Sequence, residues 1–235
     1  MAKYQRVLLK LSGEALAQGS DGIYNHAFLG EVAEVVKRCV DQGVSVAIMV
    51  GAGNIWRGRQ GVNMDRTVAD SMGMLATCIN AMMLSEAFRV AGLDNRVLTS
   101  VSMEPFAEHY SARVARQYLS EGKVVILGGG SGLPFFSTDT GAALRGAEIE
   151  ADVVLMAKNV DGIYTADPNV DKSAVKLDQL SCREILAKGL RAIDSTAAAL
   201  SMDTGVPVLC FGLDEAENIY RVVMGEHIGT EITCE

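Results

Sequence analysis

The chain has 235 residues, of which 49% are hydrophobic and 21% are charged, and its net charge is −8. This length can bury a sizeable core in one large α/β domain or in two lobes that share a sheet. The acidic balance argues against general nucleic-acid binding, which needs a basic face, but it leaves anionic substrates open because backbone amides and a few cations act locally.

Strands and helices alternate along most of the chain. This alternation predicts a parallel sheet that is covered by helices on both faces. Ligands of such open sheets bind at the carboxyl ends of the strands, so the loops that follow the strands are the places to search. The expected strands are residues 6–11, 44–50, 96–101, 123–127, 152–157, 208–211 and 228–233, and the expected helices are 28–40, 65–90, 113–119, 140–149, 181–187, 196–203 and 215–224.

Two glycine-rich loops follow buried strands. The sequence GGGSG occupies residues 128–132, and GAGN occupies residues 51–54, shortly before Arg57. A strand that leads into a glycine loop and a helix start can hold an anion on backbone N–H groups, and phosphate is the most plausible anion. Arg57 can add two parallel N–H bonds to a phosphate. A plain loop with a surface arginine is the alternative for residues 51–57.

Two better-known phosphate motifs are absent from the sequence. The pair Gly122-Lys123 is not followed by Ser or Thr, so the chain has no GxxxxGK[ST] loop. The GxGxxG fingerprint fails as well, because Trp56 and Phe135 stand where its third glycine belongs.

Lys10 lies near the end of the first expected strand, just before Ser12-Gly13. A charged residue in a buried strand must find a partner or face a cleft. In a cleft its ammonium group can neutralise the charge of phosphates during transfer. The alternative is an edge lysine whose ammonium group reaches solvent.

Two aspartates have a functional and a structural interpretation each. Asp70 lies in an apolar helix, where it either accepts hydrogen bonds from a ribose diol or caps a neighbouring loop. Asp139 follows Ser137 and Thr138 at an expected helix start, where it either caps the helix or orients cationic groups around a transferring phosphate.

The segment 158–168, KNVDGIYTADP, combines strong turn signals with a lysine, an aromatic ring and two carboxylates. An aromatic ring next to a polar backbone edge suits an adenine, whereas a β-turn followed by a bend is the structural alternative. The methionine-rich face of the helix 65–90 indicates core or a subunit interface rather than a cofactor site.

The five cysteines form no CxxC pair, which favours reduced structural thiols over disulfides or a zinc site. Lys3, Arg6 and Lys10 interrupt any signal-like apolar stretch at the N-terminus. No apolar run approaches about 20 residues, so we expect no membrane span and a cytoplasmic location.

These motifs, taken in order over almost the whole chain, resemble the amino acid kinase family in its branch that acts on uridylate. KLSGEAL and DxMGMLAT are specific to that branch. The matching strings are residues 10–16 (KLSGEAL), 53–58 (GNIWRG), 70–77 (DSMGMLAT), 134–139 (PFFSTD), 148–153 (EIEADV), 160–168 (VDGIYTADP) and 221–226 (RVVMGE).

The resemblance implies an α/β fold, an open three-layer αβα sandwich with a mainly parallel central sheet. It implies one domain over residues 1–235, with an acceptor lobe over about 1–150 and an ATP-side lobe over about 151–235. The implied activity is transfer of the γ-phosphoryl group of ATP to UMP in pyrimidine nucleotide biosynthesis. ATP carries the Mg²⁺, so the protein supplies no metal ligand. The implied assembly is a homohexamer that GTP activates and UTP inhibits, without nucleic acid or membrane.

The resemblance also assigns residues. Ala52 and Leu133 depart from the glycine and asparagine that are usual at these positions, which bears on affinity rather than on the reaction. The catalytic residues are Lys10, Arg57 and Asp139; the ATP-binding residues are Lys10, Leu11, Ser12, Gly13, Gly53, Arg57, Lys158, Asn159, Tyr164 and Asp167; the UMP-binding residues are Ala52, Asp70, Ser131, Gly132, Leu133, Pro134, Phe135, Phe136, Ser137 and Thr138.

Two other functions stay open. Another member of the same superfamily phosphorylates a carboxylate or a carbamate, but Asp70 suits a ribose and Arg57 suits an acceptor phosphate. A catalytically silent nucleotide sensor has no need of both Lys10 and Asp139.

Overall fold

The computed structural model describes residues 2–57, 61, 63–166, 170–190 and 193–235. A sheet in the order β4-β3-β5-β2-β1-β6-β10-β11-β9 runs through these residues, and its pairs are parallel except β10 with β11. The mainly parallel sheet confirms the expected fold class. The strands are β1 (Arg6–Leu11), β2 (Ser45–Val50), β3 (Asn95–Thr99), β4 (Glu108–His109), β5 (Val124–Gly128), β6 (Val153–Lys158), β9 (Gln179–Ser181), β10 (Val208–Gly212) and β11 (Thr230–Thr233).

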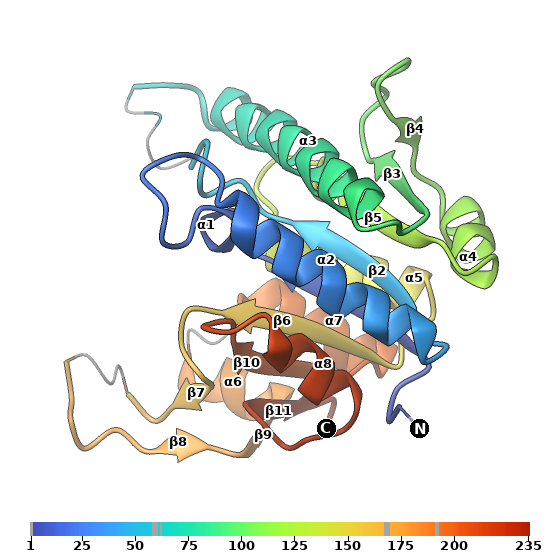
Figure 1. Cartoon of the computed structure of the whole chain (residues 1–235). Coiled ribbons are helices and arrows are strands. Elements are labelled where there is room, and N and C mark those ends of the chain that lie inside the picture. The colour runs from blue at the N-terminus through green and yellow to red at the C-terminus, as the bar shows by residue number, and fades with distance from the viewer. Residues whose placement is uncertain (1, 58–60, 62, 167–169, 191–192) are drawn as a thin grey trace.

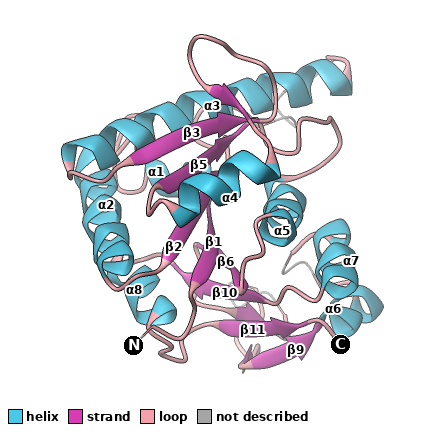
Figure 2. Ribbon diagram, turned by 90° about the vertical axis from the view of Figure 1, so that its right-hand side faces the viewer, coloured by secondary structure: helices cyan, strands magenta, loops and turns pink. Residues whose placement is uncertain are grey.

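Helices cover both faces of the sheet (Figures 1 and 2). One buried cluster lies between the sheet and α2, α3 and α8, and a second lies between the sheet and α4, α5, α6 and α7. Successive strand residues alternate between the clusters, as a pleated strand requires. The helices are α1 (Gly13–Leu16), α2 (His26–Asp41), α3 (Arg66–Val90), α4 (Ala112–Ser120), α5 (Thr138–Glu148), α6 (Cys182–Lys188), α7 (Ser195–Thr204) and α8 (Glu217–Val223).

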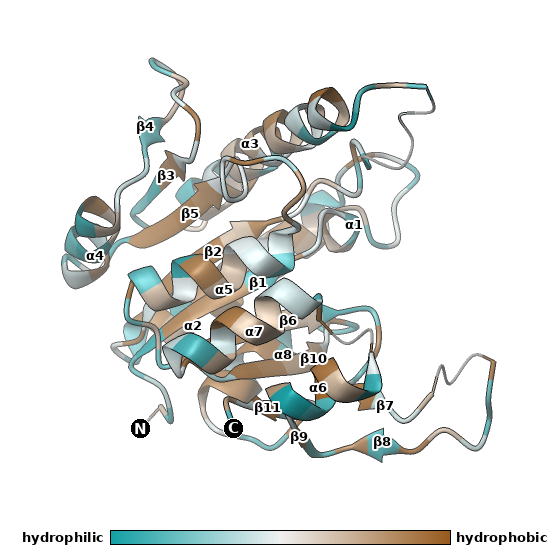
Figure 3. Ribbon diagram, turned by 180° about the vertical axis from the view of Figure 1, so that it is seen from behind, coloured by the Kyte–Doolittle hydropathy of each residue, from teal (hydrophilic) through white to brown (hydrophobic). Residues whose placement is uncertain are grey.

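Most residues of the central strands are hydrophobic, as the brown colour of β2 and β5 in Figure 3 shows, and Lys10 is a charged exception inside β1. The run in β5 is buried throughout, and the run in β1 is buried from Val7 onward. Because a strand buried on both faces cannot alternate polar with apolar residues, such runs identify the inner strands of a parallel sheet.

Several short elements were not expected from the sequence. They are α1, β4, β7 (Ile163–Tyr164) and β9. The strand β8 (Lys176–Leu177), which pairs with β7 in a two-stranded hairpin, lies within residues 169–177, where the sequence predicts a polar stretch with a short strand. The third strand ends at Thr99 rather than at residue 101, because Ser100 already packs on the glycine loop after β5. Segments of two to four residues are too short for a hydrophobic period to show.

Helix α3 is long and apolar enough to cross a membrane by length and composition alone. Its inner side packs Ala81, Leu84 and Phe88 into the first buried cluster. A core helix of a folded protein passes the same length and composition test, and α3 belongs to the outer layer of this sandwich.

The loops after β1 and β2 are in direct backbone contact. The Gly51 N–H donates to the Leu11 carbonyl at 2.8 Å. A Cβ atom on Gly13 would lie 2.4 Å from the Gly53 nitrogen and 2.5 Å from Asn54 Oδ1, which is closer than such atoms come. The absence of a side chain at position 13 therefore lets the two loops meet at one edge of the sheet.

We expect Gly13→Ala to lower the free energy of unfolding by about 1–3 kcal/mol, the usual cost of overpacking. Gly30→Ala in α2 is the matched control, because a Cβ atom there meets nothing within 4 Å. It should raise stability by about 0.5–1 kcal/mol, since alanine favours a helix interior. Urea unfolding measures both; a Gly13→Ala protein as stable as the wild type would contradict the close contact.

Candidate active site

Two lysines converge on one carboxylate at the carboxyl ends of β1 and β6. Lys10 Nζ lies 2.9 Å from Asp139 Oδ1, and Lys158 Nζ lies 2.9 Å from Asp139 Oδ2. Lys10 pairs with Met156 in the register, and Lys158 follows Met156 by two positions. Because strand side chains alternate between faces, both lysines point to the face that α5 covers. The alternation of the strands therefore sets the direction of both cations.

Asp139 stands in the first turn of α5, where the free N–H groups favour a negative charge. Ser137 caps this helix, accepting from the N–H groups of Asp139 at 3.0 Å and Thr140 at 3.2 Å. The Ser137 hydroxyl donates to Asp194, and the Thr140 hydroxyl donates to the other Asp194 oxygen at 2.8 Å. Asp194 also caps α7 by accepting from Ala197 N–H at 2.8 Å. The N-termini of α5 and α7 are thus fastened together beside Asp139.

The charges of the cluster shift the pKa of Asp139 and the pKa of Lys158. Burial would raise the pKa of Asp139, but the attraction of Lys10 and Lys158 outweighs it and holds that pKa below its usual value. Burial would lower the pKa of Lys158, but Asp139 outweighs it and raises that pKa. A second carboxylate, Asp194, lies close enough to Lys158 to raise its pKa further. Each ammonium group has three N–H donors, so the cluster can also bind an anion.

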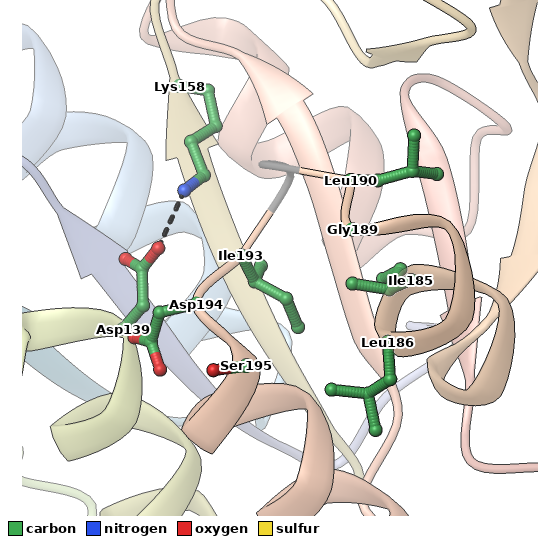
Figure 4. A pocket seen from close by; sticks show the side chains of 9 residues that line it. All are labelled: Asp139, Lys158, Ile185, Leu186, Gly189, Leu190, Ile193, Asp194 and Ser195. Carbon is green, nitrogen blue, oxygen red and sulfur yellow. Dashed lines mark hydrogen bonds and ion pairs between the residues drawn. The ribbon is translucent and has the colours of Figure 1, made fainter.

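A pocket of about 390 Å³ opens beside this cluster (Figure 4). Asp139, Lys158 and Asp194 form its polar end. Its far wall comes from α6 and the segment before α7, and it is mostly apolar. A molecule with a flat apolar part and an anionic part fits these walls. The wall residues are Ile185, Leu186, Gly189, Leu190, Ile193 and Ser195.

Arg57 forms an ion pair with Glu14, the acidic residue in the first turn of α1. A Cβ atom on Gly53 would lie 3.0 Å from Glu14 Oε1, so this carboxylate lies against the loop after β2. Ser12 caps α1 by accepting from the Ala15 N–H at 3.1 Å. The predicted phosphate-binding residues of the first two loops therefore gather around one glutamate that the sequence did not single out.

Asp70 links α3 to the loop after β5. One carboxylate oxygen accepts from the Phe135 N–H at 2.8 Å, and both oxygens accept from Arg66 Nε at 2.8 and 2.9 Å. The Arg66 guanidinium also lies 5.6 Å from the centre of the Phe135 ring. Of the two interpretations of Asp70, the structure shows the loop contact, and the ribose contact stays a prediction.

The remaining predicted residues lie around this edge in different environments. The Leu11 side chain is fully buried in the first core cluster and faces away from the loops. Asn159 lines a pocket of about 250 Å³ together with Glu14 and other residues. The Tyr164 hydroxyl donates to Asp161 Oδ1 at 2.7 Å, so it is held on its own turn. Asp167 lies outside the described residues. Half of the residues in the loop 131–138 are exposed, among them Leu133 at 58%, Phe135 at 64% and Phe136 at 47%.

Sequence reasoning missed three charged residues of this region. They are Glu14, Asp194 and Arg145. Arg145 did carry a signal, because it interrupts the apolar run of a helix and proves to be only 7% exposed. A buried cation requires partners, which only the structure identifies.

The described residues contain no group of three or more His, Cys, Asp or Glu side chains that could hold a metal ion. The Asp139 carboxylate already binds two lysines, which suits an anion site better than a metal cage.

Several known proteins are similar to this chain in sequence and structure. The sequence model described as the amino acid kinase family matches residues 5–212. The crystal structure of UMP kinase from Bacillus anthracis is similar at a TM-score of 0.94 and 37% identity, over 99% of this chain and 97% of that one. The UMP kinase from Ureaplasma parvum matches at 0.92 and 32%, over 98% and 99%. The uridylate kinase from Archaeoglobus fulgidus matches at 0.75 and 30%, over 97% and 99%.

We expect Asp139→Asn to lower the free energy of unfolding by about 3–5 kcal/mol at pH 7, because it removes the anion between two buried cations. The lowered pKa of Asp139 means that its contribution is present above the unfolded value of about 3.9 and is lost as the pH falls through the folded pKa. The difference between wild type and variant should therefore shrink below about pH 4.

Urea unfolding of both proteins between pH 7 and pH 3 measures this difference. Asp203→Asn, at an exposed position of α7, is the control and should change stability little at pH 7. A wild-type advantage over Asp139→Asn that stays constant down to pH 3 would rule out the ionised carboxylate as its cause.

Proposed function

Because the chain belongs to the amino acid kinase family, we propose that it transfers the γ-phosphoryl group of ATP to UMP, which gives UDP and ADP. The observation that carries this proposal is the cluster of Lys10, Asp139 and Lys158 at the carboxyl edge of the sheet. It is a preorganised site of positive charge in a fold shared with UMP kinases over nearly the full length. The role is one in pyrimidine nucleotide biosynthesis.

In the reaction, an oxygen of the UMP phosphate forms a bond to the γ-phosphorus while the bond from that phosphorus to the β–γ bridging oxygen breaks. Little covalent chemistry is left for the protein, so positioning and charge stabilisation supply the catalysis. Lys10 and Lys158 provide two ammonium groups on one side of the transfer path. Their free N–H donors stabilise the charge that moves onto the transferring group and the departing oxygen.

Asp139 holds the ammonium groups of Lys10 and Lys158 in place. Its pKa is too low for an effective general base, since the two ammonium groups hold the carboxylate ionised. A phosphate oxygen is already a good nucleophile and has no proton to lose at neutral pH. The carboxylate thus keeps both cations directed at the same point before the nucleotides arrive.

The two nucleotides are assigned to the two ends of this edge. We place the donor on the side of Lys158, Asn159 and Tyr164, next to the pocket that α6 and α7 border, and Asp167 completes this set. We place the acceptor against Ala52, Asp70 and the loop 131–138. Ser12-Gly13, Gly53 and Arg57 lie where the two sets meet, since the loops after β1 and β2 are in contact.

Kinases of this kind use ATP with a divalent cation, and we propose Mg²⁺ carried by the phosphates of ATP. When bound, the ion would neutralise part of the charge of those phosphates.

We further propose a cytoplasmic homohexamer with an acceptor lobe over about 1–150 and an ATP-side lobe over about 151–235, activated by GTP and inhibited by UTP. The outward face of α3 supports assembly, since it exposes a stripe of apolar side chains of the kind that oligomers cover. The stripe comprises Val68, Met72, Leu75, Ile79 and Met82, which are 36–52% exposed.

The proposal is tested by offering UMP, CMP, carbamate and N-acetylglutamate as acceptors with ATP and Mg²⁺ and measuring ADP release. We expect turnover with UMP to exceed that with the others. Lys10→Ala should lower kcat about 10²-fold or more while UMP binding is largely kept, because it removes a stabiliser of the transfer. Lys123→Ala, a lysine paired with Glu121 at the opposite end of the sheet, is the matched control.

Turnover of only carbamate or N-acetylglutamate would replace the proposed acceptor with the runner-up class. Nucleotide binding without any turnover, in the wild type as in Lys10→Ala, would instead identify a silent sensor.

We expect Asp70→Asn to weaken UMP binding about tenfold or more and ATP binding little, since a hydrogen bond to a charged group contributes about 1.5–3 kcal/mol. Asp70 also holds the Phe135 N–H, so a loop effect must be separated from a ribose contact. Deoxy-UMP separates them. If Asp70 binds the 2′-hydroxyl, the wild type prefers UMP over deoxy-UMP and the variant loses that preference.

Calorimetric titration of both nucleotides into both proteins gives the four affinities. Glu86→Gln, an exposed carboxylate of the same helix paired with Arg89, is the control. Equal weakening of UMP and deoxy-UMP would contradict a contact of Asp70 with the 2′-hydroxyl.

A further inference from the structure

Arg145 is a buried cation that the lysine cluster does not use. It lies six residues after Asp139 on α5 and is 7% exposed. Its guanidinium stacks 3.9 Å from the centre of the Tyr110 ring, and Nη1 donates to Glu148 Oε2 at 2.6 Å. The Tyr110 hydroxyl donates to the same oxygen at 2.7 Å. One side of the guanidinium is therefore fixed by an ion pair and a ring, as a buried arginine requires.

The other side of the guanidinium faces the loop after β5. Nη2 donates to Ser100 Oγ at 3.0 Å and lies 3.5 Å from the Ser131 carbonyl oxygen. Ser100 Oγ in turn donates to the Gly130 carbonyl at 2.7 Å. The Gly130 carbonyl is thus held through Ser100, and the next carbonyl, that of Ser131, is held by Arg145 itself. In a planar trans peptide the carbonyl and the following N–H point in opposite directions, so the Ser131 N–H points away from the Ser100 hydroxyl that binds the Gly130 carbonyl.

The loop also rests closely on Ser100. A Cβ atom on Gly129 would lie 3.1 Å from the Ser100 nitrogen, and one on Gly132 would lie 3.2 Å from the Ser100 oxygen. Both glycines have positive φ, +79° and +84°. Because nothing separates the loop from Ser100, a displacement of the serine displaces the loop backbone.

We propose that Arg145, acting through Ser100 and the Ser131 carbonyl, is a positioning residue that holds the glycine loop 128–132 in the form that receives the acceptor nucleotide. The inference rests on the proposed function, which assigns the residues from Ser131 onward to UMP. Lysine cannot replace Arg145, because only a planar fork reaches Glu148 and Ser100 at once.

The test compares Arg145→Lys, Ser100→Ala and the double variant with the wild type. For each single variant we expect KM and Kd for UMP to rise about 10- to 100-fold, the range for loss of one hydrogen bond to a charged group. We expect kcat within a few-fold of the wild type and the Kd for ATP unchanged. The double variant should be little worse than either single variant, because both act on one chain of contacts.

Arg116→Lys is the matched control, since Arg116 on α4 is exposed and pairs with Glu150. Arg145→Lys that weakens ATP and UMP alike, or whose effect on UMP simply adds to that of Ser100→Ala, would show a general structural role and overturn the proposal. If Arg145→Lys does not fold, Ser100→Ala decides alone: an unchanged Kd for UMP overturns the proposal, and a selective rise supports it. A wild-type protein that binds no UMP at all would instead contradict the proposed function.

Discussion

The contact of Asp139 with two buried lysines is the constraint on which the rest of the structure depends. Removing three charges from water is costly unless each faces an opposite charge at hydrogen-bond distance. Asp139 and Lys158 come from the consecutive elements α5 and β6, whereas Lys10 comes from β1 near the N-terminus, so only the folded sandwich brings each ammonium group to 2.9 Å from the Asp139 carboxylate. Each ammonium group has N–H donors beyond the one that Asp139 accepts, and an anionic ligand can bind to them where the sheet ends.

The parallel sheet determines where the other parts of the site lie. The carboxyl ends of β1, β2 and β5 lie at one edge of the sheet. The loops that follow these adjacent parallel strands are therefore neighbours. Backbone contact between the loops after β1 and β2 then needs residues without side chains, as Gly13 illustrates. The glycine content of these loops is thus first a packing requirement, and the exposed N–H groups follow from it.

The inner strands and long helices were predictable because each is long enough to show its own period. The strands β1, β2, β5 and β6 are apolar runs of five or six residues, and the helices α2 and α3 carry wide apolar faces. The short strands β4, β7 and β9 were not predictable, since pairing with a distant strand alone defines them. For the site, Lys10 was recognisable as a charged residue inside a buried strand, and Asp139 as a carboxylate at an expected helix start. That Asp139 also binds Lys158, and that Asp70 holds a loop, depends on register and packing that one sequence does not display.

Helix α5 relates the two halves of the site to each other. Its first turn holds Asp139 against the lysines, and its second half holds Arg145 beneath the glycine loop. A Cβ atom on Gly141 would lie 2.8 Å from Met49 Cε, and one on Gly146 would lie 2.5 Å from Val154 Cγ2, so the helix lies unusually close to β2 and β6. Larger residues at these two positions would lift α5 off the sheet and withdraw Asp139 from Lys10. Since one rigid helix carries both anchors, the distance between the cation cluster and the acceptor loop is set by helix geometry rather than by the loops themselves.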